Sequence, residues 1–217
     1  MSPVPVILSS PSGGGKTTIA HQLLATREDV GYSVSCTTRP PRPGEMEARD
    51  YYFLTEEKFR QRQLSGEFAE SATVHGYLYG TLRAEVERVL ASGRNVVMDI
   101  DVQGTRQFAR AFPESILIFI LPPSAKALIE RLEARGTEDV EALVRRFRSA
   151  KEELNAIDLY EYVIVNDDLD SAVRAVSEII EGKGRQYERS RSPELKARVA
   201  ELMKGIQHAI DQYSARK

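Results

Sequence analysis

The chain has very few of the side chains that form disulfides or bind transition metals. Cys36 is the only cysteine in 217 residues, so an internal disulfide is impossible and a reducing compartment is expected. We interpret Cys36 as a small, partly buried side chain rather than as a nucleophile. His21, His75 and His208 are too scattered for the spacing that metal ligands need, so we assign them no metal.

Long apolar runs and an excess of one charge are also missing. The longest apolar run extends from Ile116 to Leu121, which suits a buried strand and is too short for a membrane span. The N-terminus lacks the basic start and apolar stretch of a signal peptide. A net charge of -2 creates no global positive field for nucleic acid or an anionic membrane. We therefore expect a cytoplasmic protein that binds neither nucleic acid nor membrane.

The sequence does contain an alternation of short apolar segments and amphipathic segments. Hydrophobic residues make up 41% and charged residues 29%, a mixture that can bury a core. Val96–Met98, Ile116–Leu121 and Val163–Val165 are continuous apolar runs, as expected for parallel strands covered on both faces. The alternation predicts a three-layer α/β fold with a mostly parallel sheet.

Strands and helices are predicted throughout the chain up to residue 181. The predicted strands are Val4–Ser9, Ser33–Thr37, Glu67–Val74, Asn95–Ile100, Ser115–Leu121 and Tyr162–Asn166. The predicted helices are Lys16–Thr26, Glu56–Leu64, Leu82–Ala91, Gln103–Ala111, Ala125–Arg135, Glu138–Ile157 and Ser171–Glu181. Residues 33–81 interrupt the alternation with turns and short strands, which indicates a small β-rich insertion.

Residues 183–217 form a C-terminal segment that is more basic than the rest of the chain. Ser192 and Pro193 are typical of a helix start, a capping residue followed by proline in the first turn. Apolar residues then recur at spacings of three or four, at Leu195, Val199, Leu202, Ile206, Ile210 and Tyr213. The pattern favours a terminal helix packed on its own core. A subunit-interface helix, and hence a homo-oligomer, is a close alternative, and nucleic-acid binding by Arg185–Arg191 is a distant one.

A glycine-rich segment follows the first predicted strand directly. It matches the phosphate-loop pattern Gly-x-x-x-x-Gly-Lys-Ser/Thr, except that Ser10 replaces the first glycine. Consecutive glycines let backbone N–H groups turn inward around phosphates at the start of a helix. Lys16 would reach the β- and γ-phosphates of ATP, and Thr17 would offer a hydroxyl to Mg²⁺. The alternative is a surface turn, but the flanking strand and helix favour a nucleotide loop. The predicted ATP-binding residues here are Ser12, Gly13, Gly14, Gly15, Lys16, Thr17 and Thr18.

A cluster of basic residues follows the second predicted strand, which ends at Thr37. Arg39 and Arg42 are three apart in a loop stiffened by Pro40, Pro41 and Pro43. Guanidinium groups bind phosphate through two hydrogen bonds, and a stiff loop loses little entropy in holding them. The segment therefore predicts a phosphate site, with a solvated basic loop as the alternative.

Together with the phosphate loop, this segment resembles the guanylate kinase family, whose members transfer a phosphoryl group from ATP to GMP. The similar strings, in order, are Ser33–Ser35, Thr37–Arg39, Pro41–Arg42, Gly44–Glu45, Asp50–Tyr51, Glu67–Glu70, Tyr79–Thr81, Asp99–Gly104, Arg131–Thr137 and Val163–Asp168. The resemblance spans about residues 4–182. It implies a three-layer P-loop kinase fold with a mostly parallel sheet, a small β-rich GMP-binding insertion and a helical lid.

The resemblance also implies that the chain is divided into four parts. The core nucleotide-binding domain would comprise residues 1–32, 82–124 and 159–182. The GMP-binding subdomain would be residues 33–81, and the lid region residues 125–158. Residues 183–217 would be a C-terminal helical extension to which we assign no role.

The resemblance places the acceptor site largely in the insertion. Guanine presents N1–H and 2-amino donors, which one carboxylate can accept together and which adenine cannot reproduce. Glu70 holds the family position for this contact. The residues similar to those that grip the GMP phosphate are Arg39, Arg42, Tyr51 and Tyr79. The full predicted GMP site is Ser35, Arg39, Arg42, Tyr51, Glu70, Tyr79, Thr81 and Asp101.

For the transfer step, the resemblance implies several cations and one carboxylate. The predicted catalytic residues are Lys16, Arg39, Arg131, Arg135, Arg146 and Asp99. The three arginines after residue 130 are similar to the family's lid arginines, although ion pairs with nearby glutamates are an alternative. Asp99 would organise Mg²⁺ through water, together with the Thr17 hydroxyl. Asn166 matches a position near the ATP adenine, although asparagine after a strand is also a common turn residue.

The expected function is Mg²⁺-dependent, in-line transfer of the γ-phosphoryl group of ATP to GMP, with dGMP as a further acceptor. The alternatives are a non-catalytic guanylate-kinase-like binding module and a P-loop kinase for another nucleotide. The retained Lys16 and Thr17 argue against the first, and Glu70 argues against the second. Besides Ser10, the chain departs from the family pattern at Ala48, usually glycine, and at Ser71, often aromatic.

Overall fold

The computed structural model describes residues 2–74, 76–134 and 139–215. The chain divides into two compact units, residues 1–7 with 24–116, and residues 8–23 with 117–217. Strand β1 (Pro5–Ser9) and helix α1 (Lys16–Thr26) contribute residues to both units. His75 and Arg135 lie outside the described residues.

The strands form two sheets. The order is β2-β7-β1-β8-β9 in the five-stranded sheet and β4-β3-β6-β5 in the four-stranded sheet. In the first sheet, β2 (Val30–Tyr32) is parallel to β7 (Asn95–Asp99), and β8 (Ile116–Leu121) is parallel to β9 (Tyr162–Val165). Nearly all residues of β1 and β8 are buried, as their continuous apolar runs predict. The predicted α/β fold with a mostly parallel sheet is confirmed.

The four-stranded sheet lies in the first unit. Its strands are β3 (Cys36–Thr37), β4 (Tyr52–Phe53), β5 (Phe68–Val74) and β6 (Tyr77–Leu82). Helix α2 (Glu56–Leu64) packs on this sheet through Phe59, whose ring stacks on Phe68 at 4.5 Å between centroids. Helices α3 (Arg83–Ala91) and α4 (Val102–Ala111) follow in the same unit. The insertion predicted from the turns between residues 33 and 81 therefore has its own sheet and a small core.

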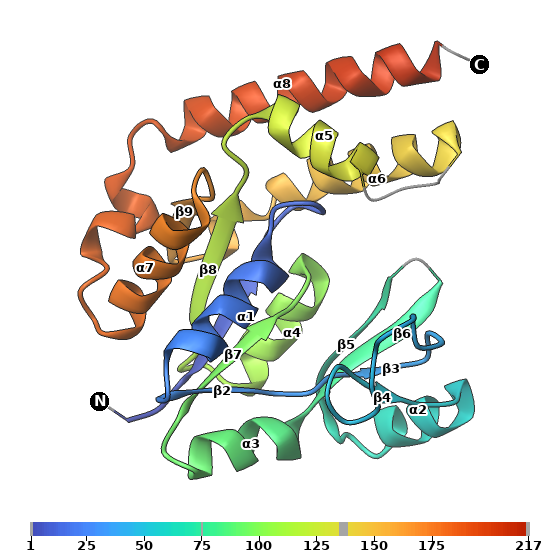
Figure 1. Ribbon diagram of the computed structural model, residues 1–217, viewed down its shortest axis with the longest axis vertical. Helices are drawn as coiled ribbons and strands as arrows, with labels where there is room; N and C mark the ends of the chain where they lie inside the picture. The colour runs from blue at the N-terminus through green and yellow to red at the C-terminus, as the bar shows by residue number, and fades with distance from the viewer. Residues whose placement is uncertain (1, 75, 135–138, 216–217) are drawn as a thin grey trace. The chain divides into compact units, whose positions relative to one another are not determined.

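The second unit is mostly helical. Its helices are α5 (Ala125–Ala134), α6 (Val140–Leu154), α7 (Leu169–Ile180) and α8 (Leu195–Ser214), with short 3-10 helices at Ile157–Leu159, Arg185–Tyr187 and Arg189–Arg191. Helix α8 runs along α5 and α6 (Figure 1). Its residues Leu202, Ile206 and Ile210 are buried, so the apolar stripe of the C-terminal segment is covered within the same unit. In the described part of the chain, no helix combines the length and apolar character needed to cross a bilayer.

Several predicted boundaries are wrong. The chain leaves one sheet at Tyr32 and enters the other at Cys36, so Ser33–Ser35 belong to no strand. Strands β2, β4 and β6 were not predicted, because β2 and β4 have three and two residues and β6 contains Gly80. The C-terminal helix begins at Leu195 rather than near Pro193, because the Leu195 N–H donates to the Ser192 carbonyl in a turn that precedes the helix.

Candidate functional site

The second unit contains the glycine-rich loop and the residues that hold its shape. Gly13 and Gly15 have φ of 86° and 94°, the left-handed region that glycine adopts without a steric penalty. The Gly14 N–H donates to the Pro11 carbonyl at 2.8 Å, which closes the turn. Helix α1 then begins at Lys16, so the positive end of its dipole lies at the loop, as an anion site requires.

Ser10, which replaces the first glycine of the pattern, carries no backbone strain. Its φ is negative, because Ala48 is the only non-glycine residue with positive φ in the described ranges. The Ser10 hydroxyl donates to the Pro11 carbonyl at 3.0 Å. A Cβ on Gly14 would come within 2.5 Å of the Ser10 Cβ. The loop therefore accepts a side chain at position 10 only because Gly14 lacks one.

Two side chains from later in the chain fix the loop. The Asn166 amide at the end of β9 donates to the Gly14 carbonyl at 2.9 Å, and a Cβ on Gly15 would collide with it. The Glu153 carboxylate on α6 accepts from the Ser12 N–H at 2.8 Å. We predicted Asn166 near the adenine, and its amide lies against the loop backbone itself. Glu153 was not predicted, because it lies 141 residues after Ser12 and no local sequence pattern relates the two.

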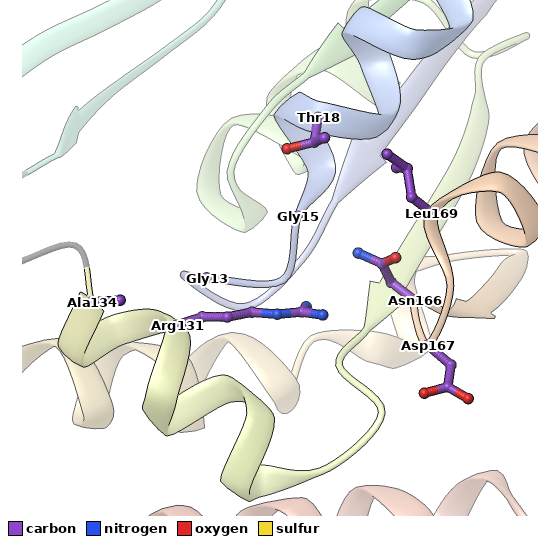
Figure 2. A pocket seen from close by; sticks show the side chains of 8 residues that line it. All are labelled: Gly13, Gly15, Thr18, Arg131, Ala134, Asn166, Asp167 and Leu169. Carbon is purple, nitrogen blue, oxygen red and sulfur yellow. The ribbon is translucent and has the colours of Figure 1, made fainter.

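A cavity of about 360 Å³ opens beside this loop (Figure 2). It is lined by Gly13, Gly15, Thr18, Arg131, Ala134, Asn166, Asp167 and Leu169. Arg131 extends from α5 alongside the glycine loop. Its Nη1 is buried and has no hydrogen-bond partner among the described residues. A buried guanidinium nitrogen without a partner costs free energy unless a ligand supplies an acceptor, so the cavity suits an anion.

The other predicted residues of this unit lie in different settings. Lys16 is half-buried at the start of α1, whereas Thr17 and Thr18 are exposed on its first turn. Arg146 on α6 donates to the Leu132 carbonyl on α5 at 3.4 Å, so it connects the two lid helices. Arg135 was predicted as a third lid arginine and lies outside the described residues.

The first unit brings three of the predicted phosphate-binding side chains together. Arg39 is only 8% exposed, and its Nε donates to the Tyr79 hydroxyl at 3.2 Å. Its guanidinium carbon lies 5.6 Å from the centre of the Tyr51 ring, a cation–π distance. Burial raises the pKa of Tyr51 to about 12, so this phenol stays protonated and can donate. The fourth predicted residue, Arg42, is exposed.

Glu45 closes this loop and was not predicted as a site residue. Its carboxylate accepts from Arg39 Nη2 at 2.7 Å and 2.9 Å, and from the Arg42 N–H at 2.7 Å. The hydrogen bond from Arg39 holds the pKa of Glu45 below its usual range. Arg39 therefore has a counter-ion within its own loop. The Gly44–Glu45 string was visible in the sequence, but nothing in it indicated which arginine Glu45 would bind.

Glu70 and Thr81 form a buried pair across strands β5 and β6. The Thr81 hydroxyl donates to Glu70 Oε1 at 2.7 Å, and the two residues are opposite each other in the sheet. The pKa of Glu70 is raised to about 7, mainly by burial; the hydrogen bond from Thr81 lowers it, and the charge of the nearby Asp101 adds to the rise. Asp101 caps α4 by accepting from the Gly104 N–H at 2.7 Å. Two predicted residues, Thr81 and Asp101, thus lie beside the buried carboxylate of a third, Glu70.

The remaining predicted residues of this unit are Asp99 and Ser35. Asp99 ends β7, and the Tyr32 hydroxyl donates to its Oδ1 at 3.0 Å. Burial, and then the charge of Asp99, raise the pKa of Tyr32, so the phenol remains a donor. Tyr32 was not predicted. The Ser35 carbonyl accepts from the Tyr52 N–H, and Ser35 itself is half-buried beside β3.

Ala48 occupies the position that is usually glycine in the family pattern. Its φ is +61°, so the turn keeps the left-handed backbone that glycine would favour. Its N–H donates to the Tyr51 carbonyl at 2.9 Å, and this hydrogen bond holds the backbone of Tyr51 in the turn. The cost of this backbone for alanine is about 1 kcal/mol.

Comparisons with known proteins agree on one family. The guanylate kinase family model matches residues 2–183. Guanylate kinase from Symbiobacterium thermophilum is 46% identical over 175 residues, which cover 81% of this chain and 83% of that protein. Guanylate kinase from Caldanaerobacter subterraneus is 42% identical over 193 residues, 89% of this chain and 94% of that protein. The crystal structure of guanylate kinase from Anaplasma phagocytophilum is similar, with a TM-score of 0.68, 33% identity, and coverage of 90% of this chain and 93% of that one.

Proposed function

The chain belongs to the guanylate kinase family, and we propose that it transfers the γ-phosphoryl group of ATP to GMP, giving ADP and GDP. The observation that carries the proposal is the buried Glu70–Thr81 pair. A carboxylate held in this way offers acceptors to the N1–H and 2-amino donors of guanine. Adenine has no such pair of donors, so Glu70 separates GMP from AMP.

The phosphate of GMP would bind where Arg39, Tyr51 and Tyr79 meet in the first unit. Arg39 has one guanidinium nitrogen on Glu45 and one on the Pro40 carbonyl, so its orientation is set before a ligand arrives. Such preorganisation reduces the entropy lost on binding. Arg42 would add a second guanidinium from the exposed part of the same loop.

The triphosphate of ATP would bind at the glycine loop of the second unit. Lys16 and the N–H groups at the start of α1 would hold the phosphates. The buried Arg131 Nη1 would gain its missing acceptor there, and Arg146, and Arg135 from outside the described residues, are proposed as further lid cations. Asn166 would act by fixing the loop backbone.

In the reaction, a GMP phosphate oxygen forms a bond to the γ-phosphorus of ATP while the bond to the β–γ bridging oxygen breaks. The attacking oxygen is already anionic, so no strong general base is required. The protein has to bring two polyanions end to end and stabilise charge that spreads over the transferred group. We propose that residues 33–81 and the lid close for this step, which solution scattering with and without both nucleotides would test.

Magnesium is the cofactor that we propose for this reaction. Thr17 offers an exposed hydroxyl at the start of α1, and Asp99 a carboxylate at the end of β7, both oxygen donors that suit Mg²⁺. Among the described residues, no group of three or more acidic, cysteine or histidine side chains could hold a metal. The residues present therefore fit an ion bound mainly by phosphate oxygens and water, which would neutralise charge on the phosphates. Chelation by EDTA is expected to stop turnover, and added Mg²⁺ to restore it.

The proposal is tested by the turnover of the full chain with ATP and each of GMP, dGMP, AMP, CMP and UMP. Coupled-enzyme detection of ADP gives the rate, and chromatography identifies the diphosphate formed. We expect GMP to be preferred and dGMP to be accepted. Turnover of none of them would favour a non-catalytic binding module, and a preference for AMP would favour a kinase for another nucleotide.

The cellular setting and assembly are proposed separately from the activity. We propose a cytoplasmic enzyme, because its substrates are cytoplasmic nucleotides and its lone Cys36 is buried and reduced. The basic stretch after residue 184 pairs with acids, Arg189 with Asp158 and Arg191 with Glu188, which argues against nucleic-acid binding. A homo-oligomer through α8 remains a prediction, which light scattering of the full chain tests.

A further inference from the structure

Strand β5, which carries Glu70, is one of the two edge strands of the four-stranded sheet. Residues of an edge strand alternate between bonding the neighbouring strand and pointing their backbone groups outward. At Ser71, the residue after Glu70, both outward groups are bonded by one side chain. The Gln107 Oε1 accepts from the Ser71 N–H at 3.2 Å, and the Gln107 Nε2 donates to the Ser71 carbonyl at 2.9 Å. The Gln107 amide thus takes the place of a missing neighbouring strand.

Helix α4 supplies this amide from the same face that approaches Glu70. Asp101, Gly104 and Gln107 are spaced by three, so they lie on one side of the helix. A Cβ on Gly104 would come within 2.4 Å of Glu70 Oε2, so the helix touches the carboxylate only because residue 104 is glycine. One turn further on, Gln107 reaches the backbone beside Glu70. The carboxylate and its strand are therefore located by consecutive turns of one helix.

Ser71 also stands where the family pattern often has an aromatic side chain. Its hydroxyl accepts from the Gln63 Nε2 on α2 at 2.9 Å. Ser71 thus has glutamine partners on both sides: Gln107 bonds its backbone and Gln63 bonds its side chain. The pair makes a matched comparison, since both are exposed glutamines that bind the same residue.

We infer that Gln107 is a positioning residue that sets guanine specificity, an inference that rests on the proposed function. It acts through the backbone of Ser71 and holds β5 at the distance from α4 at which both oxygens of Glu70 meet the two donors of guanine. Without this amide, the Ser71 N–H and carbonyl bond water instead, and the edge of the sheet can move away from α4. Recognition of two donors by one carboxylate requires both distances to be met, so a small displacement costs the contact to one donor.

The experiment compares Gln107→Ala with Gln63→Ala in the full chain. GMP and inosine monophosphate are the acceptors, because inosine monophosphate has the N1–H donor but lacks the 2-amino group. For Gln107→Ala we expect the KM for GMP to rise about five- to tenfold, with kcat and the KM for ATP within about twofold of the parent. The preference for GMP over inosine monophosphate in kcat/KM should fall by about threefold or more. Gln63→Ala should keep the parent's preference and KM values.

A second variant and a binding measurement make the test independent of turnover. Gln107→Glu keeps an acceptor for the Ser71 N–H but places a carboxylate oxygen against the Ser71 carbonyl, so its GMP preference should fall at least as far as that of Gln107→Ala. Calorimetric GMP dissociation constants should follow the same order. An unchanged GMP preference in Gln107→Ala, or an equal loss in Gln63→Ala, would overturn the inference while an active parent upholds the proposed function. A parent without GMP turnover would instead refute the proposed function.

Discussion

Glu70 is a carboxylic acid whose side chain is buried. Only 6% of the residue is exposed, and its Oε1 accepts a hydrogen bond from the Thr81 hydroxyl. Its pKa of about 7 means that the free protein holds this side chain in both protonation states near neutral pH. Guanine donors need an ionised acceptor, so binding and proton release at Glu70 are linked.

The first prediction is that the KM for GMP depends on pH around neutrality. As pH falls below about 7, Glu70 takes up a proton that GMP must displace, so the KM for GMP should rise by up to about tenfold for each pH unit. Initial rates between pH 5.5 and pH 8.5 would show this, with the KM for ATP as the internal control. A GMP KM that is the same at pH 6 and pH 8 would contradict the assignment of Glu70.

The same pKa predicts the opposite trend for the stability of the free protein. The folded pKa of about 7 lies above the ordinary value of 4.5, so the folded state binds the extra proton. The stability that this proton contributes is complete below about pH 4.5, amounts to roughly 3 kcal/mol, and is lost as pH rises through 7. Glu70→Gln should therefore lose less unfolding free energy than the parent between pH 5 and pH 8. Urea unfolding of both proteins at the two pH values measures the difference, and parallel losses would rule it out.

At the scale of elements, α4 is built to approach β5 closely. Gly104 is buried in the first turn of α4, and the atom nearest to its missing Cβ is Glu70 Oε2. Within a helix, alanine is normally preferred over glycine by up to about 1 kcal/mol. The close approach to Glu70 therefore outweighs the helix propensity at this position.

Gly104→Ala tests that approach. The added methyl group must displace Glu70 or push α4 away from β5, so kcat/KM for GMP should fall by about 100-fold or more. The KM for ATP should stay within about twofold of the parent, because the glycine loop belongs to the other unit. Far-ultraviolet circular dichroism serves as the folding control. Undiminished GMP turnover would show that the carboxylate has room that the structure does not give it.

Helices and strands could be predicted where one apolar run or one helical periodicity extends over the whole element. Helices α1 and α2 match their predicted bounds, and the apolar runs of β7, β8 and β9 place these strands within one residue at each end. Strands such as β4 are too short for any periodicity, and their pairing depends on partners far along the chain. The contacts of Glu153, Gln107 and Tyr32 could not be predicted for the same reason. Each joins residues separated by 36 positions or more, a relation that no local pattern encodes.

At the scale of the whole molecule, each unit carries one predicted nucleotide site. The residues around Glu70 and Arg39 belong to the first unit, and those around the glycine loop to the second. Binding of the two nucleotides can therefore be disturbed separately, whereas transfer needs both. A variant that loses turnover but keeps one affinity identifies the unit that it affects.

Lys16→Ala is expected to behave in this way. Loss of the loop lysine removes a cation from the ATP phosphates, so kcat should fall by about 100-fold or more. The dissociation constant for GMP, measured by calorimetry, should stay within about twofold of the parent, and the melting temperature of the free protein should be similar. Turnover near that of the parent would mean that the glycine loop is not the phosphate site.

Cys36 gives the small sheet a property that the rest of the chain lacks. The thiol is fully buried beside Phe59 and Phe68, and burial raises its pKa to about 12. A disulfide reagent can react with it only when the strands around it separate. Because the chain has no second cysteine, the rate of labelling measures the opening of this sheet alone. With GMP at 100 times its dissociation constant, labelling should slow by up to about 100-fold, so an absorbance trace would report acceptor binding without any turnover.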